Sequence, residues 1–255
     1  MSFQHIRTEM AEGIGTITLN RPPVNILNIE MMEEINQALR GFRGEKGFKV
    51  LVFQAEGKAF SAGVDVGEHL GDTVKEMVEA FHGMFRLMDE LQAPSVAVVN
   101  GSALGGGCEL ALYCDMVLAT ERSTFGQPEI MVGVFPPIAA LIFPRIIGRK
   151  KAMELILSGK TIGARDALEM GLINKIISED SLEEETRQFV DEIARHSAVV
   201  LRLTKKAATE GLCDDVEEGL RRIERIYLEE LMRTEDATEG LRAFLEKRKP
   251  VWKDR

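Results

Sequence analysis

Short, almost wholly apolar segments alternate with longer segments of helical spacing, and this alternation constrains the fold more than any other feature. The apolar segments are Lys49–Gln54 (KVLVFQ), Ser95–Asn100 (SVAVVN) and Met116–Ala119. Met77–Leu91, which precedes the second of them, carries apolar residues at helical spacing. A strand covered on both faces is continuously apolar, and strands that alternate with helices pair in parallel. The sequence therefore predicts an α/β fold.

The pattern changes close to Ser181, after which no further strand is expected. Before it, we also predict a strand over Gly15–Asn20, a helix over Ile29–Phe42 with Asn28 as its N-cap, and a helix over Gly105–Cys114. We divide the chain into an α/β core, residues 1–190, and a C-terminal helical region, residues 191–255. The helical patterns after Ser181 are Leu182–His196, Leu201–Glu210, Val216–Leu231 and Ala237–Arg248.

The charge of the chain limits its partners. Lys and Arg number 32 against 41 Asp and Glu, which gives a formal net charge of −9. Because such a surface repels phosphate backbones and anionic lipid, we expect no nucleic-acid or membrane partner. The first residues lack the features of a signal peptide, and no run of about 18 apolar residues occurs. We therefore expect a soluble, cytoplasmic protein.

The cysteines and histidines give no sign of a disulfide framework or a metal centre. Cys108, Cys114 and Cys213 form an odd, sparse set without a CxxC pair, which is typical of reduced thiols. The four histidines lie far apart, and no HExxH or Cys/His cluster is present. We expect no metal site.

Three standard motifs of nucleotide binding or hydrolysis each fail on a single residue. A P-loop ending at Ser158–Thr161 would need glycine where Glu154 stands, and a dinucleotide-binding fingerprint would need its third glycine at Leu110. A nucleophile elbow around Ser61 would need glycine at Ala59. Other loops must therefore carry the chemistry.

Two loops follow predicted strands, where α/β sheets usually hold their ligands. One is Lys58–Asp65, and the other is Leu104–Glu109, which contains three consecutive glycines at the start of a helix. The free N–H groups of that helix and one from the loop near Val64 could converge on one oxygen as an oxyanion hole. Judged by motif shape alone, tight turns in which glycine relieves steric strain are the favoured interpretation.

Two carboxylates stand beside these loops. Glu109 falls in the first turn of the helix that the glycines open, and Glu129 follows Gln127 and Pro128. Taken singly, each acidic residue is explained by stabilisation of a helix N-terminus. Taken together, two carboxylates around one water molecule are suited to general acid–base catalysis.

The motifs LNRP (19–22), KAFSAGVD (58–65), NGSALGGGCELALYCD (100–115) and FGQPEIMVGVFP (125–136) together resemble the crotonase (enoyl-CoA hydratase/isomerase) superfamily. The resemblance extends over essentially the whole chain. It implies a spiral core of ββα units with a C-terminal helical region that packs between the subunits of a homotrimer or a dimer of trimers. It also implies a coenzyme A thioester substrate and no other cofactor.

By motif position, the resemblance assigns the site residues. The backbone N–H groups of Val64 and Gly106 would form the oxyanion hole, while Glu109 would activate water and Glu129 would supply a proton, with the two roles open to exchange. Lys247 matches a lysine that reaches the CoA phosphates of a neighbouring subunit. The remaining positions expected to contact substrate or CoA are Ser61, Ala62, Asp65, Gly105, Pro136 and Pro137.

One departure from ordinary hydratases bears on the substrate. Phe135–Pro144 is bulky where those enzymes are glycine-rich, which should reshape an apolar pocket wall. Three segments are most similar to the cyclohexa-1,5-diene-1-carbonyl-CoA hydratases of anaerobic benzoyl-CoA degradation, which produce 6-hydroxycyclohex-1-ene-1-carbonyl-CoA: Gly133–Ala140, Phe81–Leu91 and Tyr227–Arg248. We therefore predict a hydratase for this ring. The alternatives are a general hydratase of linear 2-enoyl-CoA and a non-catalytic acyl-CoA binding protein.

Overall fold

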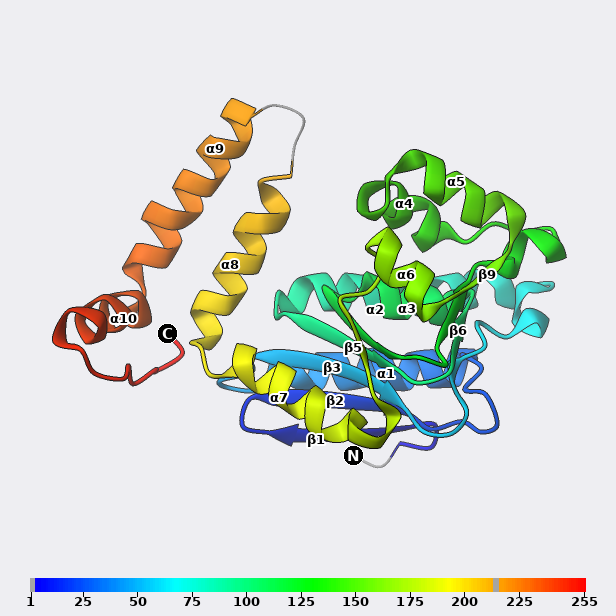
Figure 1. Cartoon of the computed structure of the whole chain (residues 1–255), viewed down its shortest axis with the longest axis horizontal. Helices are drawn as coiled ribbons and strands as arrows, with labels where there is room; N and C mark the ends of the chain where they lie inside the picture. Colours follow the sequence, from blue (N-terminus) through cyan, green and yellow to red (C-terminus); the bar gives the residue numbers. More distant parts are fainter. Residues whose placement is uncertain (1–2, 213–215) are drawn as a thin grey trace.

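A six-stranded, mostly parallel sheet forms the base of the molecule (Figure 1). The computed structural model describes residues 3–212 and 216–255. Along the sheet the strand order is β1-β2-β3-β5-β7-β10, in which β1 and β2 pair antiparallel and the others pair in parallel. The strands are β1 (Ile6–Ala11), β2 (Ile14–Leu19), β3 (Val50–Ala55), β5 (Ser95–Val99), β7 (Met116–Thr120) and β10 (Lys175–Ile177).

A second sheet of short strands stands beside the first. Its order is β4-β6-β8-β9, and β4, β6 and β8 each follow a strand of the large sheet along the chain. Two strands and a helix thus recur, as in β3–β4–α2 and β5–β6–α3, which confirms the predicted spiral of ββα units. The sequence analysis did not foresee these strands because three residues are too few to show a period. They are β4 (Ala59–Ser61), β6 (Ser102–Leu104), β8 (Thr124–Gly126) and β9 (Thr161–Gly163).

Helices cover both faces of the large sheet, as the continuously apolar strands predicted. On β3, Val50 and Val52 belong to a cluster with Val190 of α7, whereas Leu51 and Phe53 belong to the larger core with α1 and α2. Successive side chains of a strand point to opposite faces of the sheet. A strand covered on both faces is therefore apolar at successive positions rather than at every second one. The covering helices are α1 (Ile29–Arg43), α2 (Thr73–Leu91) and α7 (Leu182–Ala194).

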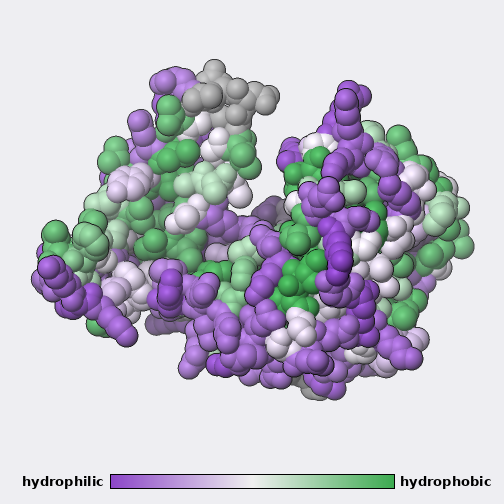
Figure 2. All heavy atoms as spheres, viewed as in Figure 1, coloured by the Kyte–Doolittle hydropathy of each residue, from purple (hydrophilic) through white to green (hydrophobic). Residues whose placement is uncertain are grey.

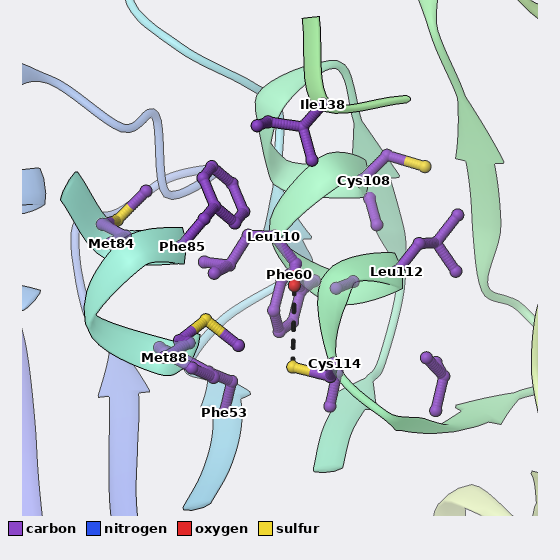
Figure 3. Close-up of a cluster of buried hydrophobic side chains, with 14 of the residues drawn as sticks. Phe53, Phe60, Met84, Phe85, Met88, Cys108, Leu110, Leu112, Cys114 and Ile138 are labelled. Atoms are coloured by element: carbon purple, nitrogen blue, oxygen red, sulfur yellow. Dashed lines mark hydrogen bonds between the residues drawn. The ribbon is translucent and has the colours of Figure 1, made fainter. Parts of the chain in front are cut away.

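Helix α3 (Gly106–Tyr113) is buried over nearly its whole length. Figure 3 shows Leu110 of α3 facing Met84, Phe85 and Met88, which come from α2. A helix packed in this way cannot shift along its axis without opening cavities, so its N-terminus is fixed in the core. Cys114, just beyond α3, is a buried free thiol, as is the cysteine at position 108; Cys213 lies outside the described residues.

The bulky segment Phe135–Pro144 comprises the two residues before α4 (Pro137–Ile146) and most of that helix, which packs against α5 (Gly148–Ser158). Pro137 is the first helical residue, where proline is well tolerated because the first N–H of a helix has no partner within it. The remaining elements before α7 are α6 (Ala164–Met170) and three short 3-10 segments, η1 (Val66–His69), η2 (Pro128–Val132) and η3 (Glu179–Ser181).

Three helices after α7 form an arm that stands apart from the rest of the molecule (Figure 1). Cations of α8 hold it to the core: Arg202 donates to the carbonyl of Phe48 at 3.0 Å, and Lys205 donates to Asp115 at 2.7 Å. The arm comprises α8 (Ala198–Glu210), α9 (Val216–Arg225) and α10 (Glu235–Glu246), with a π-helical segment (Ile226–Glu230) and a 3-10 segment (Leu231–Arg233) between the last two. Among the residues described, no helix has the length and apolarity needed to cross a membrane.

Candidate active site

The loop after β4 presents a backbone donor at Val64. Leu27 and Val64 form an isolated parallel bridge, in which the Leu27 N–H donates to Gly63 at 2.9 Å and the Asp65 N–H donates to Leu27 at 3.0 Å. These bonds use the carbonyl of Gly63 and the N–H of Asp65, the two residues on either side of Val64. The N–H of Val64 itself therefore points away from Leu27. It donates to no backbone or side-chain group in the part of the chain that the structure describes. Val64 therefore offers a free, fixed N–H.

The N-terminus of α3 presents a second donor, at Gly106. Gly105 precedes the helix with φ 51° and ψ −131°, a conformation suited to glycine, and its N–H donates to Gly126 at 2.9 Å. Gly106 is the first helical residue, so its N–H has no partner within the helix. A Cβ placed on Gly63 would lie 3.7 Å from the Gly106 nitrogen, which puts the two loops in contact. The N–H groups of Val64 and Gly106 thus belong to adjoining segments, an arrangement that can serve as an oxyanion hole.

Glu109 lies in the first turn of α3 and is only 2% exposed. Its Oε1 accepts the N–H groups of Ile138 at 2.7 Å and Ala139 at 2.8 Å. Both belong to the first turn of α4, where backbone donors have no partner within the helix. Burial raises the pKa of Glu109 to about 8, although the two donors act in the opposite direction. The side chain is thus fixed and readily protonated.

Glu129 lies on η2, above the start of α3. A Cβ added to Gly105 would lie only 2.6 Å from its Oε1, so this carboxyl group stands directly beside the N-terminus of α3. The positions of the amide oxygen and nitrogen of Gln127 are assigned from their hydrogen-bonding partners. In this orientation the nitrogen donates to Oε1 and Oε2 of Glu129, at 3.3 and 3.1 Å. Burial raises the pKa of Glu129 to about 7.

The two carboxyl groups interact electrostatically, because the charge on Glu129 raises the pKa of Glu109 further. Because the pKa of Glu129 is lower than that of Glu109, Glu129 ionises first as the pH rises. Between pH 7 and pH 8 the pair therefore holds about one proton, mainly on Glu109. One carboxylate and one carboxylic acid beside two converging N–H donors can move a proton at each end of a polarised carbonyl compound.

The structure places most of the predicted contact positions beside this site. Ser61 is fully buried, and its hydroxyl is already engaged by the Asn25 carbonyl at 2.7 Å and the Gly63 N–H at 3.2 Å. The hydroxyl is therefore engaged within the protein, and a contact between Ser61 and substrate stays a prediction. Ala62 is exposed on the same loop, and Asp65 caps η1 by accepting the N–H of Gly67 at 2.8 Å.

Lys247 is the one predicted residue that the fold keeps away from the carboxyl pair. It ends α10 with φ 54°, is exposed, and belongs to the arm, well away from α3 in Figure 1. Pro136 and Pro137, by contrast, lead directly into the turn of α4 that binds Glu109. Within one chain, Lys247 and the carboxyl pair belong to separate parts of the molecule.

Sequence reasoning missed the groups that hold the two glutamates. Ile138 and Ala139 act through backbone N–H groups, which do not depend on the type of side chain and so cannot be recognised from the sequence. They also lie 29 and 30 residues from Glu109. Gln127 was visible, since it stands two residues before Glu129. Its side chain is fully buried, and its amide donates to the Glu129 carboxylate.

The sequence and the fold are both similar to known proteins. A model of the family described as enoyl-CoA hydratase/isomerase matches residues 9–255. A probable enoyl-CoA hydratase of Rhizobium meliloti is 38% identical over 258 residues, and the alignment covers all of both chains. A cyclohexa-1,5-dienecarbonyl-CoA hydratase of Thauera aromatica is 37% identical over 239 residues, which cover 94% of this chain and 92% of that one. The crystal structure of an enoyl-CoA hydratase from Bacillus anthracis superposes with a TM-score of 0.92 at 33% identity, covering 99% of this chain and 100% of that one.

Proposed function

The chain belongs to the enoyl-CoA hydratase/isomerase family, the crotonase superfamily, and is a hydro-lyase; we propose that its substrate is cyclohexa-1,5-diene-1-carbonyl-CoA, which it converts to 6-hydroxycyclohex-1-ene-1-carbonyl-CoA. The observation that carries this choice is the position of α4. Its first turn holds Glu109 and consists of Pro137, Ile138 and Ala139. A rigid, apolar wall attached to a catalytic carboxyl suits a flat ring better than a flexible chain. Similarity to the Thauera aromatica enzyme supports the same choice.

The reaction follows from the arrangement of donors and carboxyl groups. The thioester oxygen would accept the N–H groups of Val64 and Gly106, which stabilise the negative charge that develops on it as water attacks. One carboxylate of the pair takes a proton from water, whose oxygen bonds to the β-carbon of the ring. The other carboxyl group donates its proton to carbon at the far end of the diene, a 1,4-addition. Coenzyme A enters as part of the substrate, and we propose no other cofactor.

Lys247 would act on a neighbouring subunit. The arm exposes apolar side chains on α9, α10 and the segment between them, and they gather on that part of the surface in Figure 2. We propose that this surface is covered in a homotrimer or a dimer of trimers, which would carry Lys247 toward the CoA phosphates of another chain. The protein would then work in the cytoplasm as an acidic oligomer. The exposed side chains are Leu220, Ile223, Tyr227, Leu228, Leu241, Phe244 and Leu245.

The hydration rate should depend on pH as a bell-shaped curve. Water addition needs one ionised and one protonated carboxyl group, so the pair is active with a single proton. Burial raises the pKa of Glu129 to about 7 and that of Glu109 to about 8, so the maximum should lie between these values. Below pH 7 the base becomes protonated, and above pH 8 the acid is lost. Initial rates measured from pH 5 to 10 test this, and a rate that stays constant from pH 6 to 9 would contradict it.

The substrate is tested by comparing kcat/KM for cyclohexa-1,5-diene-1-carbonyl-CoA and crotonyl-CoA, with products separated by chromatography. We expect the diene to be preferred by about tenfold or more, since one or two well-fitted apolar contacts are worth that much. A preference for crotonyl-CoA would instead make the protein a general hydratase of linear 2-enoyl-CoA. Binding of both thioesters with turnover of neither would make it an acyl-CoA binding protein.

A further inference from the structure

Asn25 and Ser61 form a buried hydrogen-bonded pair directly behind the loop that carries the Val64 donor. Asn25 is 1% exposed and Ser61 is fully buried. The Ser61 hydroxyl donates to the Asn25 carbonyl at 2.7 Å and accepts the N–H of Gly63 at 3.2 Å. Gly63 immediately precedes Val64, so the hydroxyl is one peptide unit from an oxyanion-hole donor. The catalytic carboxyl groups make no use of this pair.

Asn25 is held too firmly to follow a movement of Ser61. Its side-chain amide donates to the carbonyls of Glu56 and Ala59, both at 2.9 Å, and its Oδ1 accepts the N–H of Arg21 at 2.8 Å. Its backbone adopts φ 52°, which is left-handed and which asparagine tolerates better than most residues. With every polar atom of its amide engaged, Asn25 is a fixed point for the Ser61 hydroxyl.

Ser61 also touches the segment that carries the second donor. A Cβ added to Gly107 would lie 2.5 Å from the Ser61 Cβ, so α3 packs directly on this side chain. Gly107 follows Gly106, whose N–H is the other half of the oxyanion hole. Ser61 therefore lies between the two donor-bearing segments and contacts both of them.

We propose that Ser61, anchored by Asn25, is a positioning residue that sets the separation and orientation of the Val64 and Gly106 donors. The proposal rests on the hydratase function proposed above. Donors of an oxyanion hole act when they lie about 2.7–3.1 Å from the developing oxyanion. Displacement of the loop therefore reduces the stabilisation of the transition state more than that of the bound substrate. Loss of the hydroxyl should therefore lower kcat and leave KM nearly unchanged.

The test compares Ser61→Ala with Ser95→Ala. Ser95 is a matched control because it is 1% exposed, donates to the Asp115 carboxylate at 2.8 Å and accepts the Asp115 N–H at 3.0 Å, away from the site. For Ser61→Ala we expect kcat to fall about tenfold to a hundredfold, less than for loss of a whole donor, with KM within about threefold of wild type. Ser95→Ala should lower Tm by a similar amount and keep the wild-type kcat.

A spectroscopic readout separates positioning from general destabilisation. Benzoyl-CoA labelled with ¹³C at the thioester carbonyl cannot be hydrated without loss of aromaticity, so it serves as a stable probe. On binding wild type or Ser95→Ala its carbonyl resonance should move downfield, because the donors polarise the carbonyl. On binding Ser61→Ala the displacement should be clearly smaller. Equal displacements in Ser61→Ala and wild type would overturn the proposal.

The outcomes distinguish this inference from the proposed function. Wild-type protein that hydrates neither crotonyl-CoA nor the cyclic diene would overturn both. Wild-type protein that hydrates either one, together with a Ser61→Ala variant of unchanged kcat, would overturn the positioning role alone. Equal losses of kcat in Ser61→Ala and Ser95→Ala would also overturn it, because both would then reflect a loosened fold.

Discussion

Hydration by the Glu109→Gln and Glu129→Gln variants should fall by about 10²- to 10⁴-fold, the usual contribution of a general acid or base. Glutamine preserves the shape of each side chain but can neither accept a proton from water nor donate one to carbon. Glu109→Gln keeps an oxygen for the N–H groups of Ile138 and Ala139, so the local fold should persist. Steady-state kinetics on the preferred thioester measure the loss. Near-wild-type turnover in either variant would remove that residue from the catalytic pair.

The thermal stability of Glu109→Gln provides the control for folding, and the change of its Tm with pH relative to wild type has a definite sign. Burial raises the folded-state pKa of Glu109 from 4.5 to about 8, so the stability that this carboxyl contributes is complete below pH 4.5 and is lost as the pH rises toward 8. Glutamine does not titrate. The Tm of the variant should therefore rise relative to wild type between pH 5 and pH 8. A Tm difference that stays constant over that interval would mean that Glu109 is ionised in the folded protein.

Gly105→Ala should lower kcat by about a hundredfold or more, an effect comparable to loss of one oxyanion-hole donor. The new Cβ would lie 2.6 Å from Oε1 of Glu129, closer than nonbonded atoms approach, so the carboxyl group must move. The same residue has φ 51°, which strains any side chain, and it immediately precedes the Gly106 donor. The variant thus disturbs an acid–base group and a donor together. Kinetics with the preferred thioester measure the effect.

Gly171→Ala is the matched control for backbone strain. Gly171 ends α6 with φ 82°, and a Cβ there would meet no atom within 4 Å. Its replacement should destabilise the protein as Gly105→Ala does, without any effect on the carboxyl pair, so Tm should fall and kcat should stay at the wild-type value. If the two variants lose activity to the same degree, strain alone explains the loss, and Glu129 is not displaced.

Local patterns in the sequence were sufficient to predict the main helices and the longer strands. The apolar segment Lys49–Gln54 predicted a strand covered on both faces, and β3 is such a strand. Asn28 was predicted as the N-cap of the first helix, and its side chain accepts the N–H of Met31 at 3.2 Å. The helix predicted over Val216–Leu231 is instead an α-helix that continues into π- and 3-10 segments. Helical spacing alone does not distinguish these forms.

The sequence by itself therefore determined the α/β class, the helices and long strands, and the loops and acidic residues of the site, because each rests on side-chain type and short spacing. Tertiary structure alone decided how those groups act. The donors to Glu109 are backbone groups about 30 residues away, and the pKa of each glutamate is raised by burial, which no single residue records. Packing also places Ser61 behind the loop, where its hydroxyl holds the backbone. Contacts of this kind arise only when distant segments are packed together, because they depend on burial and distance rather than on local order.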